Sequence, residues 1–247
     1  MLLCLLLSPI PNVFAQTAGQ RAGEIGALRP DATRNAEAVK VKDALAWNDF
    51  LRTLATGRLR ANLVDDSMLS MGSSSELKVV QHDAASQQTA LELNYGRLRS
   101  RVVQLTKPGA KFEVKTPHAV IGVIGTDFYI FVDADRTLVI VFSGKVQVIP
   151  LRRSDDRTVP AVPVPPGADV GEGQMIECRR SGLVGQPSAT PPSVQQDAID
   201  STTVEEPSTG GKWTKKRKVL VILAIAAAIA IGVAIGVTRD DSTSTGP

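Results

Sequence analysis

Short runs of alternating hydrophobic and polar residues follow one another from about Ala22 to Cys178. In RLRANLV, Leu59, Ala61 and Leu63 alternate with polar side chains, and TALELNYG, FEVKT and DFYIFVD repeat the scheme. This period of two is typical of β-strands with one buried and one solvent-facing side. Polar turn clusters such as DDS, GSSS and KPG separate the runs. The pattern predicts an all-β domain over residues 22–178, built of stacked short strands as a β-solenoid or a sandwich-like domain.

One stretch inside this region is ambiguous between helix and strand. In DALAWNDFLRTLA, residues 43–55, the positions of Leu45, Trp47 and Leu51 fit one side of a helix or two bent strands. Aromatic residues make up 4% of the chain. Trp47 is therefore expected to anchor the core rather than to stack on a ligand.

Hydrophobic residues are concentrated near the C-terminal end. VLVILAIAAAIAIGVAIGV, from Val219 to Val237, holds no polar or charged side chain and would span roughly 28 Å as a helix. It predicts a single transmembrane helix in the lipid bilayer, followed by a short tail, residues 238–247. Small residues recur every fourth position on one face of that helix, which is a possible contact for a homodimer. They are Ala224, Ala228, Gly232 and Gly236.

The N-terminal residues 1–15 predict a signal peptide. A leucine-rich core, Leu2–Leu7, is followed by Val-Phe-Ala before Gln16, although the usual positive residues before the core are missing. Removal of this segment would leave Cys178 as the one remaining cysteine, so no disulfide within the mature chain is expected. The β domain is then predicted to be extracytoplasmic, in the periplasm.

Between the β domain and the predicted membrane helix, residues 181–211 are rich in Ser, Thr, Pro and Gly and contain no basic residue. Such a composition predicts a disordered linker, because it buries too little apolar surface to offset the entropy of ordering. The basic segment KWTKKRK, residues 212–218, then precedes the predicted membrane helix. By the positive-inside rule this segment favours a cytoplasmic β domain, in conflict with the signal peptide. We give precedence to export, because a signal peptide commits the chain to translocation before the predicted transmembrane helix reaches the translocation machinery.

Charge argues against nucleic-acid binding. The formal net charge is +3, but five of the basic residues lie in KWTKKRK, so the rest of the chain carries about −2. No general basic surface is expected.

Candidate catalytic and metal-binding residues are few. His82 and His118 are far apart in sequence and are both predicted to be exposed; no Cys or His pair has zinc-ligand spacing, so no metal and no cofactor are predicted. The phosphate-binding loop motif fails in VIVFSGKV, and the nucleophile elbow G-x-S-x-G is missing. Asp127 could act as an aspartic-protease carboxylate only with a second carboxylate, and no second copy of its surroundings exists. We therefore predict that the protein is not an enzyme.

The stretch TPHAVIGVIGTDF, residues 116–128, is predicted to be a structural corner. Pro117 makes the residue before it extended, so Lys115-Thr116-Pro117 should end a strand. Glycines permit positive φ at the corner, Thr and Asp can cap free amides, and the strand alternation resumes afterwards. The residues of this corner are Thr116, Pro117, Gly122, Gly125, Thr126, Asp127 and Phe128.

At these residues the sequence resembles the FecR domain family, the extracytoplasmic part of iron-dicitrate-type transmembrane signal regulators. The resemblance runs from about Trp47 to Glu177. FEVKTPHAVIGVIGTDF is similar to the family's F-x-V-x-T-P and G-x-x-G-T-x-F elements, LELNYGRLRSRV to its L-x-L-x-x-G-x-L strand, VIVFSGKVQV to its hairpin, and GEGQMIE to its closing G-Q element.

Two departures limit what the resemblance implies. Ile124 stands where the family often has arginine before Gly-Thr, and the predicted membrane helix follows the β domain instead of preceding it. Only ten residues lie beyond that helix, too few for a sigma-binding domain. The resemblance thus implies a membrane-tethered module that binds or senses another envelope protein. The alternative is an envelope scaffold or polysaccharide-binding module.

Overall fold

A computed structural model describes residues 20–152, 162–163, 167–182 and 185–204, all of which belong to one compact unit. The predicted signal peptide, membrane helix, tail and the small-residue face of that helix lie outside these residues. Within the described part of the chain, no helix has the length and apolar character needed to cross a membrane.

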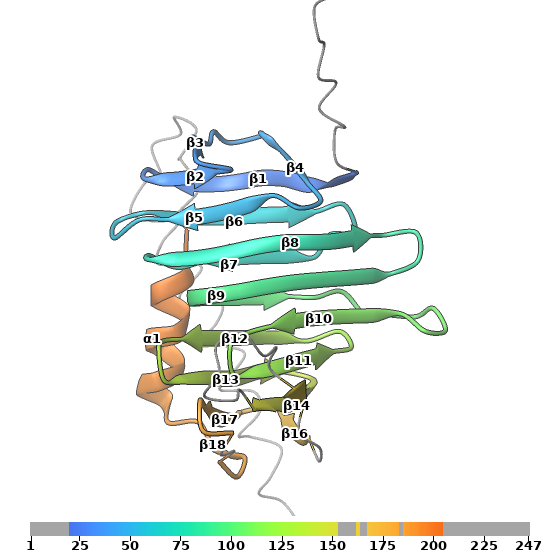
Figure 1. Ribbon diagram of the computed structural model, residues 1–247, viewed down its shortest axis with the longest axis vertical. Helices are drawn as coiled ribbons and strands as arrows, with labels where there is room; N and C mark the ends of the chain where they lie inside the picture. The colour runs from blue at the N-terminus through green and yellow to red at the C-terminus, as the bar shows by residue number, and fades with distance from the viewer. Residues whose placement is uncertain (1–19, 153–161, 164–166, 183–184, 205–247) are drawn as a thin grey trace, which may run out of the picture. The chain divides into compact units, whose positions relative to one another are not determined.

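The described residues form two facing sheets and one helix, so the all-β prediction is confirmed (Figure 1). In spatial order, sheet A holds β4 (Ala44–Ala46), β1 (Arg21–Arg29), β6 (Arg58–Leu63), β7 (Met68–Met71), the second half of β9 (Gln88–Arg101), β12 (Asp127–Val132), β13 (Arg136–Ser143), β17 (Gln174–Arg179) and β18 (Ser188–Ala189).

Sheet B faces sheet A and also consists of short strands. It holds β3 (Glu37–Ala38), β2 (Ala32–Arg34), β5 (Phe50–Thr53), β8 (Ser75–Asp83), the first half of β9, β10 (Lys111–Lys115), β11 (Ala119–Val123), β14 (Lys145–Arg152) and β16 (Ala168–Gly171), and β15 (Val162–Pro163) pairs with the end of β14. Among these pairs β9–β10 is parallel and the others are antiparallel.

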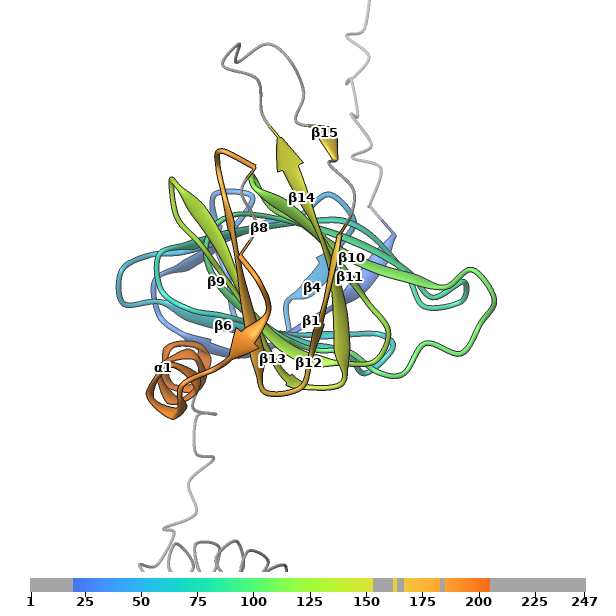
Figure 2. The same cartoon turned by 90° about the horizontal axis from the view of Figure 1, so that it is seen from below.

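The chain passes back and forth between the sheets, with a hairpin in one before it crosses to the other. Crossings lie at residues with positive φ, which release the chain from the strand direction: Ser74, Gly96, Gly125, Gly144 and Gly173. Gly96 bends β9 itself, so this strand belongs to both sheets. Viewed along the stack, the strands form two layers (Figure 2), and most of the buried hydrophobic side chains make up one core cluster.

The core lies between the sheets and follows the predicted alternation. In β6, Leu59, Ala61 and Leu63 are buried and the residues between them are partly exposed. Phe112 and Phe128 are the bulkiest side chains among the fully buried residues. The ambiguous segment 43–55 forms strands β4 and β5, and Trp47 between them packs on the core while its indole Nε1 donates to the His82 carbonyl at 2.8 Å.

The predicted disordered linker, residues 181–211, differs most from the structure. It contains β18 and a helix, α1 (Pro192–Thr202), that packs on the outer side of sheet A (Figure 2). The prediction is wrong there because average composition hides a spacing: Val194, Ala198 and Thr202 are four residues apart and share one helix face.

Candidate functional site

The predicted corner begins with a tightly bonded turn between β10 and β11. The Thr116 hydroxyl accepts a hydrogen bond from the Ala119 amide at 3.0 Å and lies 2.9 Å from the Thr137 hydroxyl. His118 Nδ1 lies 3.1 Å from the same Thr137 hydroxyl. Thr116 and Pro117 therefore follow the end of β10 as predicted, and Thr116 and His118 connect the turn to β13.

The two glycines of the corner have different roles. Gly125 has φ +70° at the crossing from sheet B to sheet A, as predicted. Gly122 lies inside β11, paired with Glu113 and Gln147, and does not turn the chain. The prediction for Gly122 is wrong because spacing alone does not distinguish a glycine in a strand from one in a turn.

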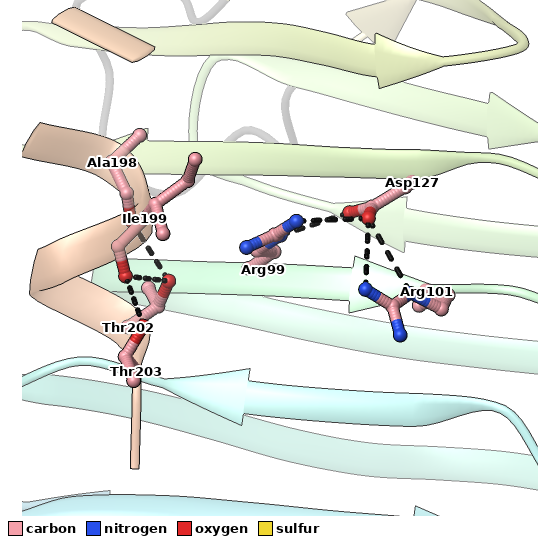
Figure 3. Close-up of polar contacts among 7 residues, drawn as sticks. All are labelled: Arg99, Arg101, Asp127, Ala198, Ile199, Thr202 and Thr203. Carbon is pink, nitrogen blue, oxygen red and sulfur yellow. Dashed lines mark hydrogen bonds and ion pairs between the residues drawn. The ribbon is translucent and has the colours of Figure 1, made fainter. Parts of the chain in front are cut away.

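Thr126 and Asp127 differ from the capping roles that the sequence suggested, whereas Phe128 resumes the strand alternation as predicted. Thr126 donates its hydroxyl to the Lys145 carbonyl at 3.0 Å, and Phe128 is fully buried in the core. Asp127 accepts hydrogen bonds at 2.9 Å from both Nε and Nη2 of Arg99 and contacts Arg101 at 3.4 Å (Figure 3). Asp127 thus connects the corner to the outer face of sheet A.

Five arginines project from this outer face. Because side chains of a strand alternate between its two sides, Arg-x-Arg in β6 and Arg-x-Arg-x-Arg in β9 place every guanidinium away from the core. Strand β7 lies between them, with Ser70 opposite both Arg60 and Arg99. We call Arg58, Arg60, Arg97, Arg99 and Arg101 the arginine ladder.

The neighbouring part of the same face is apolar. The side chains that β12, β13 and β17 turn outward are Tyr129, Phe131, Leu138, Ile140, Phe142 and Met175. The arginine ladder meets this apolar half through cation–π contacts, with the Arg97 guanidinium 5.0 Å from the centre of the Phe131 ring and that of Arg99 4.5 Å from the Phe142 ring. The outer face thus combines positive charge with aromatic surface.

Helix α1 lies across this face. Ala198 packs on Tyr129 and Ile140, and burial raises the pKa of the Tyr129 phenol. At the end of the helix, Arg58 of the arginine ladder donates to the carbonyls of Asp200 at 2.6 Å and Thr203 at 2.9 Å. α1 has no basic residue in its last turn, so β6 supplies the cation that a helix C-terminus favours.

Two depressions flank α1. The larger, about 460 Å³, lies between α1 and the sheet. Its lining includes Arg58 and Arg97, four residues of the apolar half, and two acidic residues of α1: Tyr129, Phe131, Leu138, Ile140, Asp197 and Asp200. The smaller, about 180 Å³, is lined by Arg60, Arg99 and Arg101 together with Met68, Ser70 and the residues at the end of α1. Figure 3 shows how Arg99 and Arg101 share Asp127 beside that end.

Both histidines are buried, which corrects the prediction that they are exposed. The exposed fraction is 1% for His82 and 3% for His118. His82 Nδ1 lies 2.9 Å from the Thr89 hydroxyl, and burial lowers the His82 pKa despite the nearby carboxylates of Asp65 and Asp83. Within the described residues no group of three or more His, Cys, Asp or Glu is placed to hold a metal ion.

Sequence reasoning singled out the corner but not the arginine ladder or α1. The available signal was the run Arg97-Leu-Arg-Ser-Arg101, whose charges share one side of a strand. What could not be read from it was that β6 lies on the same sheet two strands away, because that depends on long-range pairing.

Comparison with known proteins supports the family resemblance. Residues 49–147 match the family model described as FecR protein, so the resemblance inferred from the motifs is confirmed over these residues. No curated protein matches the chain.

Two solved structures from Parabacteroides distasonis ATCC 8503, each described as a "putative anti-sigma factor", match this chain in part. The first is 15% identical, with a TM-score of 0.44, and the match covers 57% of this chain and 59% of the other. The second is 13% identical, with a TM-score of 0.44, and the match covers 78% of this chain and 95% of the other.

Proposed function

We propose that this chain, whose residues 49–147 carry a FecR domain, is a regulatory signalling module of the cell envelope that binds another protein. In this proposal residues 1–15 export the domain, residues 219–237 hold it in the membrane, and the β domain lies in the periplasm. The module itself catalyses no reaction and takes no cofactor.

The outer face of sheet A is the observation that supports protein binding most directly. Arginine and aromatic residues are the types most enriched at protein interfaces and among the residues that dominate their affinity. Here the arginine ladder and the apolar half bring both types together on one sheet face. Cross-strand ion pairs occur on both outer faces, with Arg99–Asp127 on sheet A and Arg52–Glu76 on sheet B, whereas the outer apolar cluster lies on sheet A.

Site-specific photo-crosslinking in intact cells tests the binding face. A photoreactive amino acid replaces Arg101, whose side chain is 61% exposed on sheet A, or Lys115, which is 57% exposed on sheet B and serves as the matched control. We expect a discrete crosslinked species from position 101 only. Equal crosslinking at both positions, or none at either, would contradict the proposed binding face.

The membrane orientation needs a separate experiment. A specific protease site inserted between Gly210 and Gly211 should be cut in intact spheroplasts, which releases the β domain. Cleavage only after lysis would mean that KWTKKRK sets the topology and that the β domain faces the cytoplasm. A cytoplasmic protein with the same protease site reports whether the spheroplasts are sealed.

A further inference from the structure

Helix α1 has few features that would make it stable alone. It is 11 residues long, begins after Pro191 without a side-chain cap, and has no acidic residue in its first turn and no basic residue in its last. Isolated helices of this length are marginal in water even with the best helix-forming residues. The helical state of residues 192–202 therefore depends on contacts with sheet A.

Those contacts leave much of the groove under the helix open. Ala198 and Thr202 are the residues of α1 that are fully buried, and both have short side chains. A depression of about 460 Å³ remains beside them, lined by Tyr129, Phe131 and other residues of the apolar half. A helix with longer apolar side chains at the positions of Val194 and Ala198 would bury more of this surface.

The charges around the groove indicate which helix fits. Arg58 and Arg97 line it on the sheet side, and Asp197 and Asp200 line it on the helix side. Arg58 also donates to the carbonyls at the end of α1. The sheet therefore complements a helix that carries acidic residues beside its apolar stripe and ends near Arg58.

We propose that α1 occupies a groove for an acidic amphipathic helix of a partner protein, and that the partner's helix displaces it. This rests on the proposed protein-binding function and specifies the partner segment: Leu, Ile, Met or Phe spaced four residues apart, with Asp or Glu on the flank facing Arg58 and Arg97. α1 precedes the predicted membrane segment in sequence. Displacement of α1 by a partner would therefore change the part of the chain that leads to this segment.

The displacement of α1 is tested with the purified full chain and a peptide that carries larger apolar side chains than α1. The probe is a fluorescent peptide of residues 190–204 with Val194→Leu and Ala198→Leu. We expect saturable binding by fluorescence anisotropy, together with faster hydrogen exchange of the α1 amides in the protein. A control peptide that also carries Asp197→Lys and Asp200→Lys should bind at least tenfold more weakly.

Two substitutions in the protein's own α1 make the test a competition. Ala198→Leu strengthens the resident helix and should weaken peptide binding about tenfold, whereas Ala198→Asp weakens it and should tighten peptide binding. Both leave the groove residues of the sheet unchanged. Circular dichroism confirms that each variant retains the β domain.

Three results would overturn the proposal. In the first, the peptide binds neither the wild-type chain nor the Ala198→Asp variant. In the second, peptide binding is insensitive to both substitutions at Ala198. In the third, the peptide binds without faster hydrogen exchange of the α1 amides. Sedimentation of the purified chain tests whether a second copy of the chain occupies the groove instead. A dimer in which each copy's α1 fills the other's groove would assign the groove to self-association and also overturn the proposal. Since the assay uses purified components, it is independent of export and crosslinking, so its failure and that of the proposed function are distinguishable.

Discussion

A position can require glycine for two reasons: a positive φ, or too little space for a Cβ. Alanine substitutions at Gly122, Gly109 and Gly125 separate these two reasons. At Gly122 the backbone is an ordinary strand, and an added Cβ would approach only the Gln147 carbonyl oxygen, at 3.9 Å. Gly109 has φ +73° with no atom within 4 Å of the added Cβ. Gly125 has φ +70°, and an added Cβ there would meet Gln104 Oε1 and lie 2.8 Å from Gln104 Cα.

The free energies of unfolding should differ accordingly. Replacing glycine by alanine lowers the entropy of the unfolded chain and stabilises by about 0.4–1 kcal/mol where no strain arises, which is the expectation for Gly122→Ala. A left-handed alanine costs about 1–2 kcal/mol, so Gly109→Ala should be neutral or destabilising by up to about 1.5 kcal/mol. The approach to the Gln104 backbone adds about 1–3 kcal/mol at Gly125, for a net loss of about 1–4.5 kcal/mol.

Urea unfolding followed by circular dichroism measures the three values, with the denaturation midpoint compared at constant slope. The predicted order of stability is Gly122→Ala, then Gly109→Ala, then Gly125→Ala. Equal losses at positions 109 and 125 would show that the close approach to Gln104 is unimportant. A loss at Gly122 as large as that at Gly125 would refute the assignment of the corner to Gly125.

Further predictions concern the buried and paired ionisable groups. Asp127→Asn should destabilise the fold by about 1–2 kcal/mol, because it weakens the charge-assisted bonds to the partly buried Arg99. A double-mutant cycle with Arg99→Ala should show coupling, and additive losses would refute the pairing. The His82 pKa is lowered by burial, so the stability from neutral His82 is present above about pH 6.5 and is lost as pH falls toward the folded-state pKa. Melting temperatures should drop more between pH 7.5 and 5.5 in wild type than in His82→Phe, and equal drops would contradict this. Burial raises the Cys178 pKa to about 11, so the thiol should react with iodoacetamide at pH 8 only after unfolding; rapid labelling of the native protein would oppose the prediction.

Strand positions and the type of core were readable from local sequence. The alternation in RLRANLV and DFYIFVD predicts which side chains of β6 and β12 face inward, because successive residues of a strand point to opposite sides whatever it pairs with. Trp47 packs on the core, and Gly125 turns the corner at positive φ. These features depend on the chain within a few residues of each position.

Burial of polar residues was not readable in this way. His82 and His118 looked like exposed turn residues, yet Thr89 and Thr137 from neighbouring strands supply hydroxyls that let the imidazoles lie inside. Gly122 looked like a turn residue and lies within β11. In each case residues on a paired or neighbouring strand determine the environment.

The amino-acid sequence by itself determined the stacked strands, the inward face of runs such as RLRANLV and DFYIFVD, and the turn at Gly125, since alternation and backbone freedom are local properties. Only the tertiary structure decided that the arginines of β6 and β9 form one ladder and that residues 192–202 become a helix. Strand order in sheet A brings the arginines together, and the apolar half of that sheet gives a short helix without an N-terminal side-chain cap the surface that stabilises it.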